Sequence, residues 1–580
     1  MTRTISTVWS LLTADQRRDA VRLVCLMLLG VALEALSVGL IVPVLAVLTD
    51  PGLLAQYPWL TMRAGDSVMP DRMVLAITLA LVLFGAYAAK NLLLAYLAWR
   101  QSTFWAELSA EISQRLLGVY LRQPYSFHLQ RNSAQLFQNV MGEADVLAMN
   151  VIAPAMLLLS ELLVLACLLT LVFWFQPVGT VVVVLVIGSA ALFFVRLVTP
   201  HTIAWGIQRQ HHSGQMVQQL QQGLGAVKDV KVLGREADFL HQYRVHRENN
   251  ARVAGLQNMF ARLPQLWLEV LAVGGLVALI VTMILRQEPL DAIVPTLGLF
   301  AAAAFRLTPS VNRMMGANQA LRFGMPAVER LDQELGLSGD TVVAPFGRTM
   351  TFRKELRFEA VCFAYPSALG LAIQSISLKI PKGSSVGIVG ASGAGKSTLL
   401  DIVLGLLTPD SGAVTVDGVD IQSCLREWQN NIGYVPQAIF LTDDSIRRNV
   451  AFGLPDDGID EQKVLLAIQM AQLGQYVGEL AQGLDTLVGE RGIRLSSGQR
   501  QRLGIARALY HDPEVLVLDE ATSALDADTE NSLMELVQAC RGDKTLLIVA
   551  HRPSTIAGCD LIFRLDRGQL IADPTAVVPS

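Results

Sequence analysis

Six short motifs follow one another in a fixed order between residues 390 and 551, and they constrain the fold of this chain more than any other feature. The first, G-A-S-G-A-G-K-S, is a complete match to the phosphate-binding loop, in which glycines let backbone N–H groups surround phosphates at the start of a helix. The other five are Y-V-P-Q, L-S-S-G-Q, V-L-V-L-D-E, S-A-L-D and A-H-R. The apolar runs 385–390 and 515–518, within S-V-G-I-V-G and V-L-V-L, predict two buried strands of an α/β domain, and a helix is expected from Lys396 onward.

The preceding part of the chain contains six apolar segments long enough to cross a bilayer, which takes about 20 mostly apolar residues in a helix. The segments are Val21–Leu48, Met73–Ala98, Ile152–Phe175, Val178–Val198, Leu266–Leu285 and about Leu290–Val311. Arginine and lysine are concentrated in the N-terminal lead-in and in the stretch 199–265, and such residues mark the cytoplasmic side of a membrane. We therefore expect the N-terminus, the long stretches 99–151 and 199–265, and the domain that follows to be cytoplasmic.

Composition agrees with two unlike halves. The chain has 580 residues, of which 52% are hydrophobic and only 17% charged, with a mean hydropathy of +0.43. The net charge of −4 gives no reason to expect nucleic acid as a partner. The six cysteines are scattered, and none forms a C-x-x-C pair, which argues against a zinc site or a disulfide framework.

The complete motif series resembles one family, the ATP-binding cassette (ABC) ATPases, and the whole chain is similar to the half-transporters of type IV ABC exporters. The resemblance implies a membrane α-helical bundle of six transmembrane helices fused to an α/β P-loop NTPase domain. It places the transmembrane domain at residues 1–330, a linker at 331–350 and the nucleotide-binding domain at 351–580. The stretches Pro124–Gln135 and Gly225–Glu236 look like the family's two cytoplasmic coupling loops.

The resemblance also implies roles for individual residues, with ATP and Mg²⁺ as cofactors. Lys396 would reach the β- and γ-phosphates, and Ser397, Asp519 and Gln437 would contact Mg²⁺. Glu520 is expected to be the general base for the attacking water, and Gln437 is expected to contact this water and to sense the transmembrane half. His551 would contact the γ-phosphate and hold the catalytic geometry. The expected nucleotide contacts are Tyr365, which would stack on adenine, the loop residues Gly390, Ser392, Gly393, Ala394, Gly395, Lys396, Ser397 and Thr398, and Asp526 between the two nucleotide sites.

The signature motif implies a dimer. Ser496, Gly498 and Gln499 would contact the nucleotide of a second subunit, so two copies are required. We expect a homodimer, with a heterodimer as the alternative. Ser497 stands where the family usually has glycine, and Pro553 follows the A-H-R motif where an aliphatic residue is commoner, and both departures leave the family assignment unchanged.

Ionisable residues inside apolar segments indicate the cargo. Lys90 and Arg306 would suit an anionic lipid in a cavity, whereas the alternative is that they form ion pairs with glutamates such as Glu34, Glu161 or Glu269. The segments Ala32–Leu45, Leu263–Glu269 and Phe305–Arg313 resemble bacterial flippases of lipid-linked oligosaccharides. The sequence therefore predicts an ATP-hydrolysing flippase of polyprenyl-pyrophosphate glycans in the bacterial cytoplasmic (inner) membrane. The alternative is a multidrug or lipid A exporter of the same fold.

Overall fold

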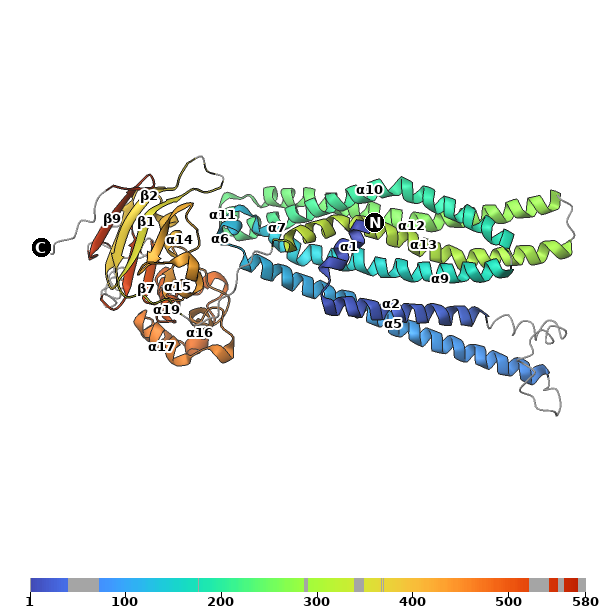
Figure 1. Cartoon of the computed structure of the whole chain (residues 1–580), viewed down its shortest axis with the longest axis horizontal. Coiled ribbons are helices and arrows are strands. Elements are labelled where there is room, and N and C mark those ends of the chain that lie inside the picture. Colours follow the sequence, from blue (N-terminus) through green and yellow to red (C-terminus); the bar gives the residue numbers. More distant parts are fainter. Residues whose placement is uncertain are drawn as a thin grey trace. The chain divides into compact units, whose positions relative to one another are not determined.

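The computed structural model describes residues 2–39, 72–175, 177–285, 290–337, 349–366, 368, 370–520, 542–550, 556 and 558–571. The chain forms two compact units (Figure 1). The first consists of Met1–Gln123 with Gln130–Gly339, and the second of Pro124–Leu129 with Asp340–Ser580.

The first unit is built from long helices. They are α1 (Thr2–Leu11), α2 (Ala14–Gly39), α5 (Arg72–Arg122), α9 (Ala153–Phe175), α10 (Pro177–Gly225), α12 (Glu236–Leu285) and α13 (Leu290–Leu335). Short pieces connect them: α7 (Ser133–Phe137), the π-helical turns η2 (Gln138–Glu143) and η3 (Leu147–Ile152), α8 (Ala144–Val146) and α11 (Val227–Leu233). Five of the six predicted spans lie entirely in helical segments, and the sixth, Val21–Leu48, is helical as far as Gly39.

Within the described residues, four helices are long and apolar enough to cross a membrane: Ala80–Arg122, Ser133–Cys167, Gly188–Gly225 and Glu236–Thr282. The predicted span Val21–Leu48 continues beyond Gly39, where the described part of α2 ends. The predicted span from Leu290 lies in α13, whose side chains are described only from Leu307 onward.

Close helix crossings and ion pairs hold this bundle together. A methyl group at Gly206 on α10 would lie 2.3 Å from the Phe323 carbonyl oxygen on α13, so these two backbones touch. The fully buried carboxylate of Glu143 in η2 accepts a hydrogen bond of 2.8 Å from Arg209 on α10. A buried carboxylate is stable only with such a partner, so this pair fixes η2 against α10.

The second unit contains two β-sheets. The antiparallel sheet has the order β2-β1-β4-β5, with β1 (Glu355–Phe363), β2 (Ile373–Pro381), β4 (Ser411–Val416) and β5 (Val419–Asp420). The larger sheet has the order β10-β9-β3-β8-β7-β6, with β3 (Ser385–Gly390), β6 (Ile432–Val435), β7 (Val515–Asp519), β8 (Thr545–Val549), β9 (Leu561–Asp566) and β10 (Gln569–Leu570). Its strands are parallel except for the β9–β10 pair. The two strands predicted from buried apolar runs are confirmed as β3 and β7, because such runs suit a sheet covered on both faces.

Helices cover the larger sheet and form a helical subdomain beside it. They are α14 (Lys396–Val403), α15 (Leu425–Gln429), α16 (Ile446–Val450), α17 (Glu461–Met470), α18 (Gly474–Glu479) and α19 (Ser497–Leu509), with 3₁₀ turns η4 (Ile421–Cys424), η5 (Asp456–Gly458), η6 (Gly483–Asp485) and η7 (Glu490–Gly492). Trp428 is fully buried, and its indole N–H donates to the Val403 carbonyl at 2.7 Å, which fixes α15 to the end of α14.

The short helix α6 (Tyr125–Gln130) begins in the segment that groups with this second unit. Burial, followed by the charges of Asp401 and Tyr365, raises the pKa of the Tyr125 hydroxyl above its usual value. The start of α6, the first part of the predicted loop Pro124–Gln135, therefore lies among residues of the second unit.

Candidate nucleotide site

The phosphate-binding loop connects β3 to α14, and the surrounding backbone admits only glycine at two of its positions. A methyl group at Gly390 would lie 2.4 Å from the Leu565 carbonyl oxygen on the neighbouring strand β9. Gly395 has a φ of +100° and would place a methyl group 2.8 Å from the Ala372 carbonyl oxygen. The loop therefore approaches adjacent chain segments closely at these two glycines. Between them, Ala391, Ser392 and Gly393 are exposed, whereas Ala394 is buried.

Lys396, the first residue of α14, is buried and folds back over the loop. Its ammonium group donates to the carbonyl oxygens of Gly390 at 2.9 Å and Ala391 at 3.0 Å. A cation held against the loop at the positive end of a helix is arranged for anion binding. Ser397, the next residue, is exposed, so its hydroxyl is accessible to a bound ion.

Tyr365 lies close to α14 although it follows β1 in the sequence. Its hydroxyl is 3.1 Å from the hydroxyl of the buried Thr398, and its ring packs edge-on against Phe363 at 5.1 Å between centroids. The structure therefore brings the predicted adenine-stacking residue next to the phosphate loop.

Acidic side chains converge where β7 ends. Burial and the neighbouring Glu520 raise the pKa of Asp519, and Lys396 partly offsets this. Burial, followed by Asp519, raises the pKa of Asp401 on α14 to about 6. This clustering of carboxylates beside one lysine attracts cations.

Glu520 occupies a strained position that fixes its direction. Its φ is +47°, which is uncommon for a residue with a side chain, and its N–H donates to the Val549 carbonyl at 2.9 Å. Its carboxylate accepts a hydrogen bond of 2.6 Å from the side-chain amide of Gln437. The structure thus brings together two residues that are 83 positions apart and were assigned to the attacking water.

The residues present fit Mg²⁺, which prefers oxygen ligands and completes its coordination with water and phosphate. Asp519, Ser397 and Gln437 all offer oxygen atoms around the loop. Within the described residues there is no group of three or more His, Cys, Asp or Glu side chains that could hold a metal ion. Only one of the three expected protein ligands, Asp519, is acidic, so a nucleotide and water would supply most of the ligands of a bound ion.

The signature motif forms the start of α19. Ser496 is its N-cap: the Ser496 hydroxyl accepts from the N–H of Gln499 at 3.2 Å, and the Gln499 side chain accepts from the N–H of Ser496 at 2.9 Å. This capping box makes the signature a preformed, exposed helix start. Ser497 is exposed in the first turn, so a side chain in place of the usual glycine meets no obstruction within this chain.

The predicted site residues Asp526 and His551 lie outside the described part of the chain, as does Pro553, which departs from the family pattern. The same holds for the side chains of Arg306 and Glu34. Lys90 is half-buried, with its ammonium group 4.7 Å from the ring centroid of Tyr87.

Among the glutamates considered as partners for Lys90 and Arg306, Glu161 instead pairs with Arg313. The guanidinium donates to both Glu161 oxygens, at 2.5 and 3.1 Å, and also to the Ser310 hydroxyl at 3.4 Å. Glu161 is 8% exposed, whereas the Arg313 side chain is 48% exposed. Sequence reasoning missed Arg313, although its position seven residues after Arg306, on the same face of one helix, was a usable signal.

Comparison with known proteins covers both halves of the chain. The family model "ABC transporter transmembrane region" matches residues 39–285, and the model "ABC transporter" matches residues 373–523. An ATP-dependent lipid A-core flippase of Ralstonia nicotianae is 30% identical over 456 residues, which cover 78% of this chain and 76% of the relative. The chain belongs to the ABC transporter family.

Other similarities agree with this assignment. An ATP-dependent lipid A-core flippase of Chromobacterium violaceum is 28% identical over 558 residues, covering 95% of this transporter and 91% of the relative. The structure of a bacterial Atm1-family ABC exporter with ATP bound matches with a TM-score of 0.78 at 24% identity, over 97% of this chain and 96% of that chain. The predicted exporter fold and ATP-driven translocase activity are confirmed, and the chain is a multi-pass membrane protein that binds ATP.

Proposed function

We propose that this ABC transporter flips an anionic amphipathic glycolipid of the lipid A-core type across the bacterial cytoplasmic membrane. The observation that carries the proposal is the similarity to lipid A-core flippases over 95% of the chain, membrane half included. This favours the alternative drawn from the sequence over the predicted flippase of lipid-linked oligosaccharides. Both cargoes share a phosphate-bearing headgroup on lipid chains, so the ligand chemistry expected of the membrane half is the same.

ATP binding begins with a change of partner at Lys396. Its ammonium group now donates to two loop carbonyls, and the β- and γ-phosphates of ATP would replace them as stronger, charged acceptors. Ser397, Asp519 and Gln437 would hold Mg²⁺, which supplies positive charge to the phosphates when bound. Tyr365, already beside α14, would cover the adenine.

Hydrolysis depends on Glu520. The carboxylate would take a proton from the attacking water, while the Gln437 amide at 2.6 Å holds one carboxylate oxygen in place. The backbone of Glu520 is also held to β8, because its N–H donates to the Val549 carbonyl. His551 is proposed to contact the γ-phosphate, two residues after β8 ends.

Two subunits would complete each site. The exposed, capped start of α19 would place Ser496, Gly498 and Gln499 on the nucleotide of a second copy, and a homodimer is the simplest assembly because each chain supplies its own Glu520 and Lys396. The ATPase and the N-terminus are proposed to be cytoplasmic, where ATP is available. Pro124–Leu129 groups with the ATPase, and from its resemblance to the family's first coupling loop we propose that it has that role here.

The cargo is proposed to be held by cations in the membrane half. Lys90, Arg306 and Arg313 are the candidates, and Arg313 is the one whose surroundings support the idea best. About half of the Arg313 side chain is exposed while its partner Glu161 is buried, so we propose that a phosphate binds Arg313 without removing the ion pair.

Reconstitution tests the proposal. Purified chain in proteoliposomes is supplied with ATP and with lipid A-core, a polyprenyl-pyrophosphate oligosaccharide or an uncharged hydrophobic drug. We expect lipid A-core to stimulate ATP hydrolysis and to be moved, with loss of movement in Glu520→Gln. Movement of the oligosaccharide alone would replace the proposed cargo by the one first predicted, and stimulation by the drug alone would make the chain a multidrug exporter.

A further inference from the structure

The segment that follows Gln437 is fastened along the signature helix α19. Ile439 packs directly on α19, because a methyl group at Gly504 would lie 2.3 Å from its terminal carbon. Leu441 packs in the same way on Gly492, which precedes the signature: a methyl group there would lie 2.6 Å from a Leu441 methyl carbon. The two glycines thus leave room for this segment to lie against the backbone on both sides of the signature motif.

Arg507 adds polar contacts to this packing. It lies near the end of α19, and three of its N–H groups donate to the Asn449 carbonyl at 2.8 Å, the Phe440 carbonyl at 2.8 Å and the Asn449 side-chain oxygen at 3.1 Å. Its guanidinium also lies 4.5 Å from the ring centroid of Phe452. Burial lowers the pKa of Arg507 to about 10, so it stays protonated at physiological pH.

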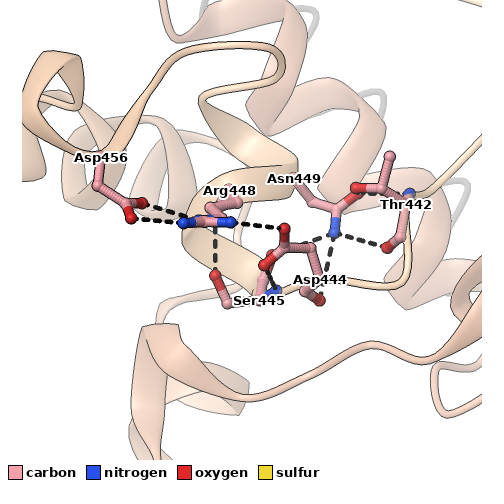
Figure 2. Close-up of polar contacts among 6 residues, drawn as sticks. All are labelled: Thr442, Asp444, Ser445, Arg448, Asn449 and Asp456. Atoms are coloured by element: carbon pink, nitrogen blue, oxygen red, sulfur yellow. Dashed lines mark hydrogen bonds and ion pairs between the residues drawn. The ribbon is translucent and has the colours of Figure 1, made fainter. Parts of the chain in front are cut away.

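Asn449, on α16, binds the end of the same segment at Thr442 (Figure 2). Its side chain is fully buried, and its oxygen accepts from the N–H of Thr442 at 3.0 Å and from the Thr442 hydroxyl at 3.2 Å. Its NH₂ group donates to the carbonyl oxygens of Thr442 at 3.0 Å, Ser445 at 3.1 Å and Asp444 at 3.4 Å. One amide therefore satisfies the backbone of a whole turn, and Arg507 binds that amide to α19.

These contacts connect two parts of the ATPase with different tasks. One end of α19 carries Ser496, and the helix runs for 13 residues, about 20 Å, to its last residue Leu509. The fastened segment begins two residues after Gln437, whose side chain holds Glu520. Two positions of this segment contact α19 directly: Ile439 packs on Gly504, and the Phe440 carbonyl accepts from Arg507. Thr442 is connected to α19 indirectly, because it bonds to Asn449, which Arg507 binds. These contacts resist separation of α19 from the chain that carries Gln437.

We propose that Arg507 and Asn449 are positioning residues for ATP hydrolysis: they clasp the Gln437 segment to the signature helix so that both move as one body. Docking of Ser496 on a second subunit's nucleotide would then set the position of Gln437, and through it Glu520, in the subunit's own site. The proposal rests on the dimeric mechanism proposed above. It predicts an effect on turnover that is distinct from nucleotide binding, since neither residue touches the phosphate loop.

The test compares three variants of the purified full-length chain in detergent, without cargo. Asn449→Ala removes the side-chain amide that binds both Thr442 and Arg507. Arg507→Lys keeps the charge but cannot donate to the Phe440 and Asn449 carbonyls together. Arg448→Ala is the matched control: it lies on the same helix α16, and its side chain pairs with Asp444 and Asp456 at the surface (Figure 2). Turnover is expressed per nucleotide-binding site, measured with a fluorescent ATP analogue, so that misfolded protein is not counted.

We expect kcat to fall at least tenfold in Asn449→Ala and three- to tenfold in Arg507→Lys, with the KM for ATP within threefold of wild type. Arg448→Ala should stay within twofold on both constants. The proposal is overturned if both clasp variants keep wild-type kcat per binding site, if KM rises in step with the loss of kcat, or if Arg448→Ala loses as much. A wild-type chain that hydrolyses ATP but moves no lipid refutes the proposed cargo and leaves this comparison intact.

Discussion

Replacing Glu520 by glutamine separates proton abstraction from every other task at the nucleotide site. Glutamine has the same size, and its carbonyl oxygen can still accept the Gln437 hydrogen bond that the carboxylate now accepts at 2.6 Å. The backbone contact to Val549 does not involve the side chain. The variant therefore loses only the ability to take a proton from water. Positioned general bases contribute about 10²–10⁴-fold to rate, which corresponds to about 2.7–5.5 kcal/mol in the activation free energy.

The affinity of Glu520→Gln for ATP should stay the same or increase, although its turnover falls. Glu520 contributes to the raised pKa of Asp519, so a neutral residue at 520 lowers that pKa and leaves Asp519 more fully ionised for Mg²⁺. One negative charge fewer beside the phosphates also favours ATP. We expect a kcat at least 100-fold below wild type with equal or tighter ATP binding, measured by single-turnover hydrolysis and equilibrium binding.

Glu514→Gln is the matched control, because Glu514 lies on the same domain but pairs with Lys382 at the surface, and it should hydrolyse ATP normally. Turnover of Glu520→Gln within threefold of wild type would refute the role of Glu520 as base.

Three further changes give distinct outcomes. Gly395→Ala should reduce ATP affinity at least tenfold in a binding titration, because φ is +100° and the methyl group would lie 2.8 Å from the Ala372 carbonyl oxygen; near-normal affinity would contradict the loop geometry. Arg313→Ala leaves the buried Glu161 unpaired and should lower stability by about 3 kcal/mol, whereas adding Glu161→Gln should recover most of the unfolding temperature. Burial raises the pKa of Asp401 to about 6 from 3.8, so ionisation opposes folding and stability falls as the pH rises from about 4 to 6. Asp401→Asn should therefore raise the unfolding temperature at pH 7.5, with little change at pH 4; an equal gain at both pH values would exclude this titration as the cause.

Much of the nucleotide site was predictable because its motifs are local. The phosphate loop needs glycines, a lysine and a helix start within eight consecutive residues, so strand β3, helix α14 and their junction follow from sequence spacing alone. Buried strands of a parallel sheet are likewise visible as short apolar runs, as β7 shows. The six apolar segments predicted the membrane half for the same reason, because the bilayer imposes a length on each helix.

Contacts between segments that are distant in the sequence could not be predicted in this way. Nothing near Arg313 in the sequence says that Glu161, 152 residues earlier, is its partner, and sequence reasoning offered Glu161 to Lys90 and Arg306 instead. Arg507 and Asn449 are 58 residues apart, and their clasp exists only because α19 packs beside the segment after Gln437.

The sequence by itself determined the family, the two halves and the chemistry at the phosphate loop, since these depend on residue type and on spacing within one element. Only the tertiary structure decided which charges pair and which segments move together. Hydrogen bonds and ion pairs act over about 3 Å, and which side chains come that close depends on how helices and strands cross, a property that no short stretch of chain encodes.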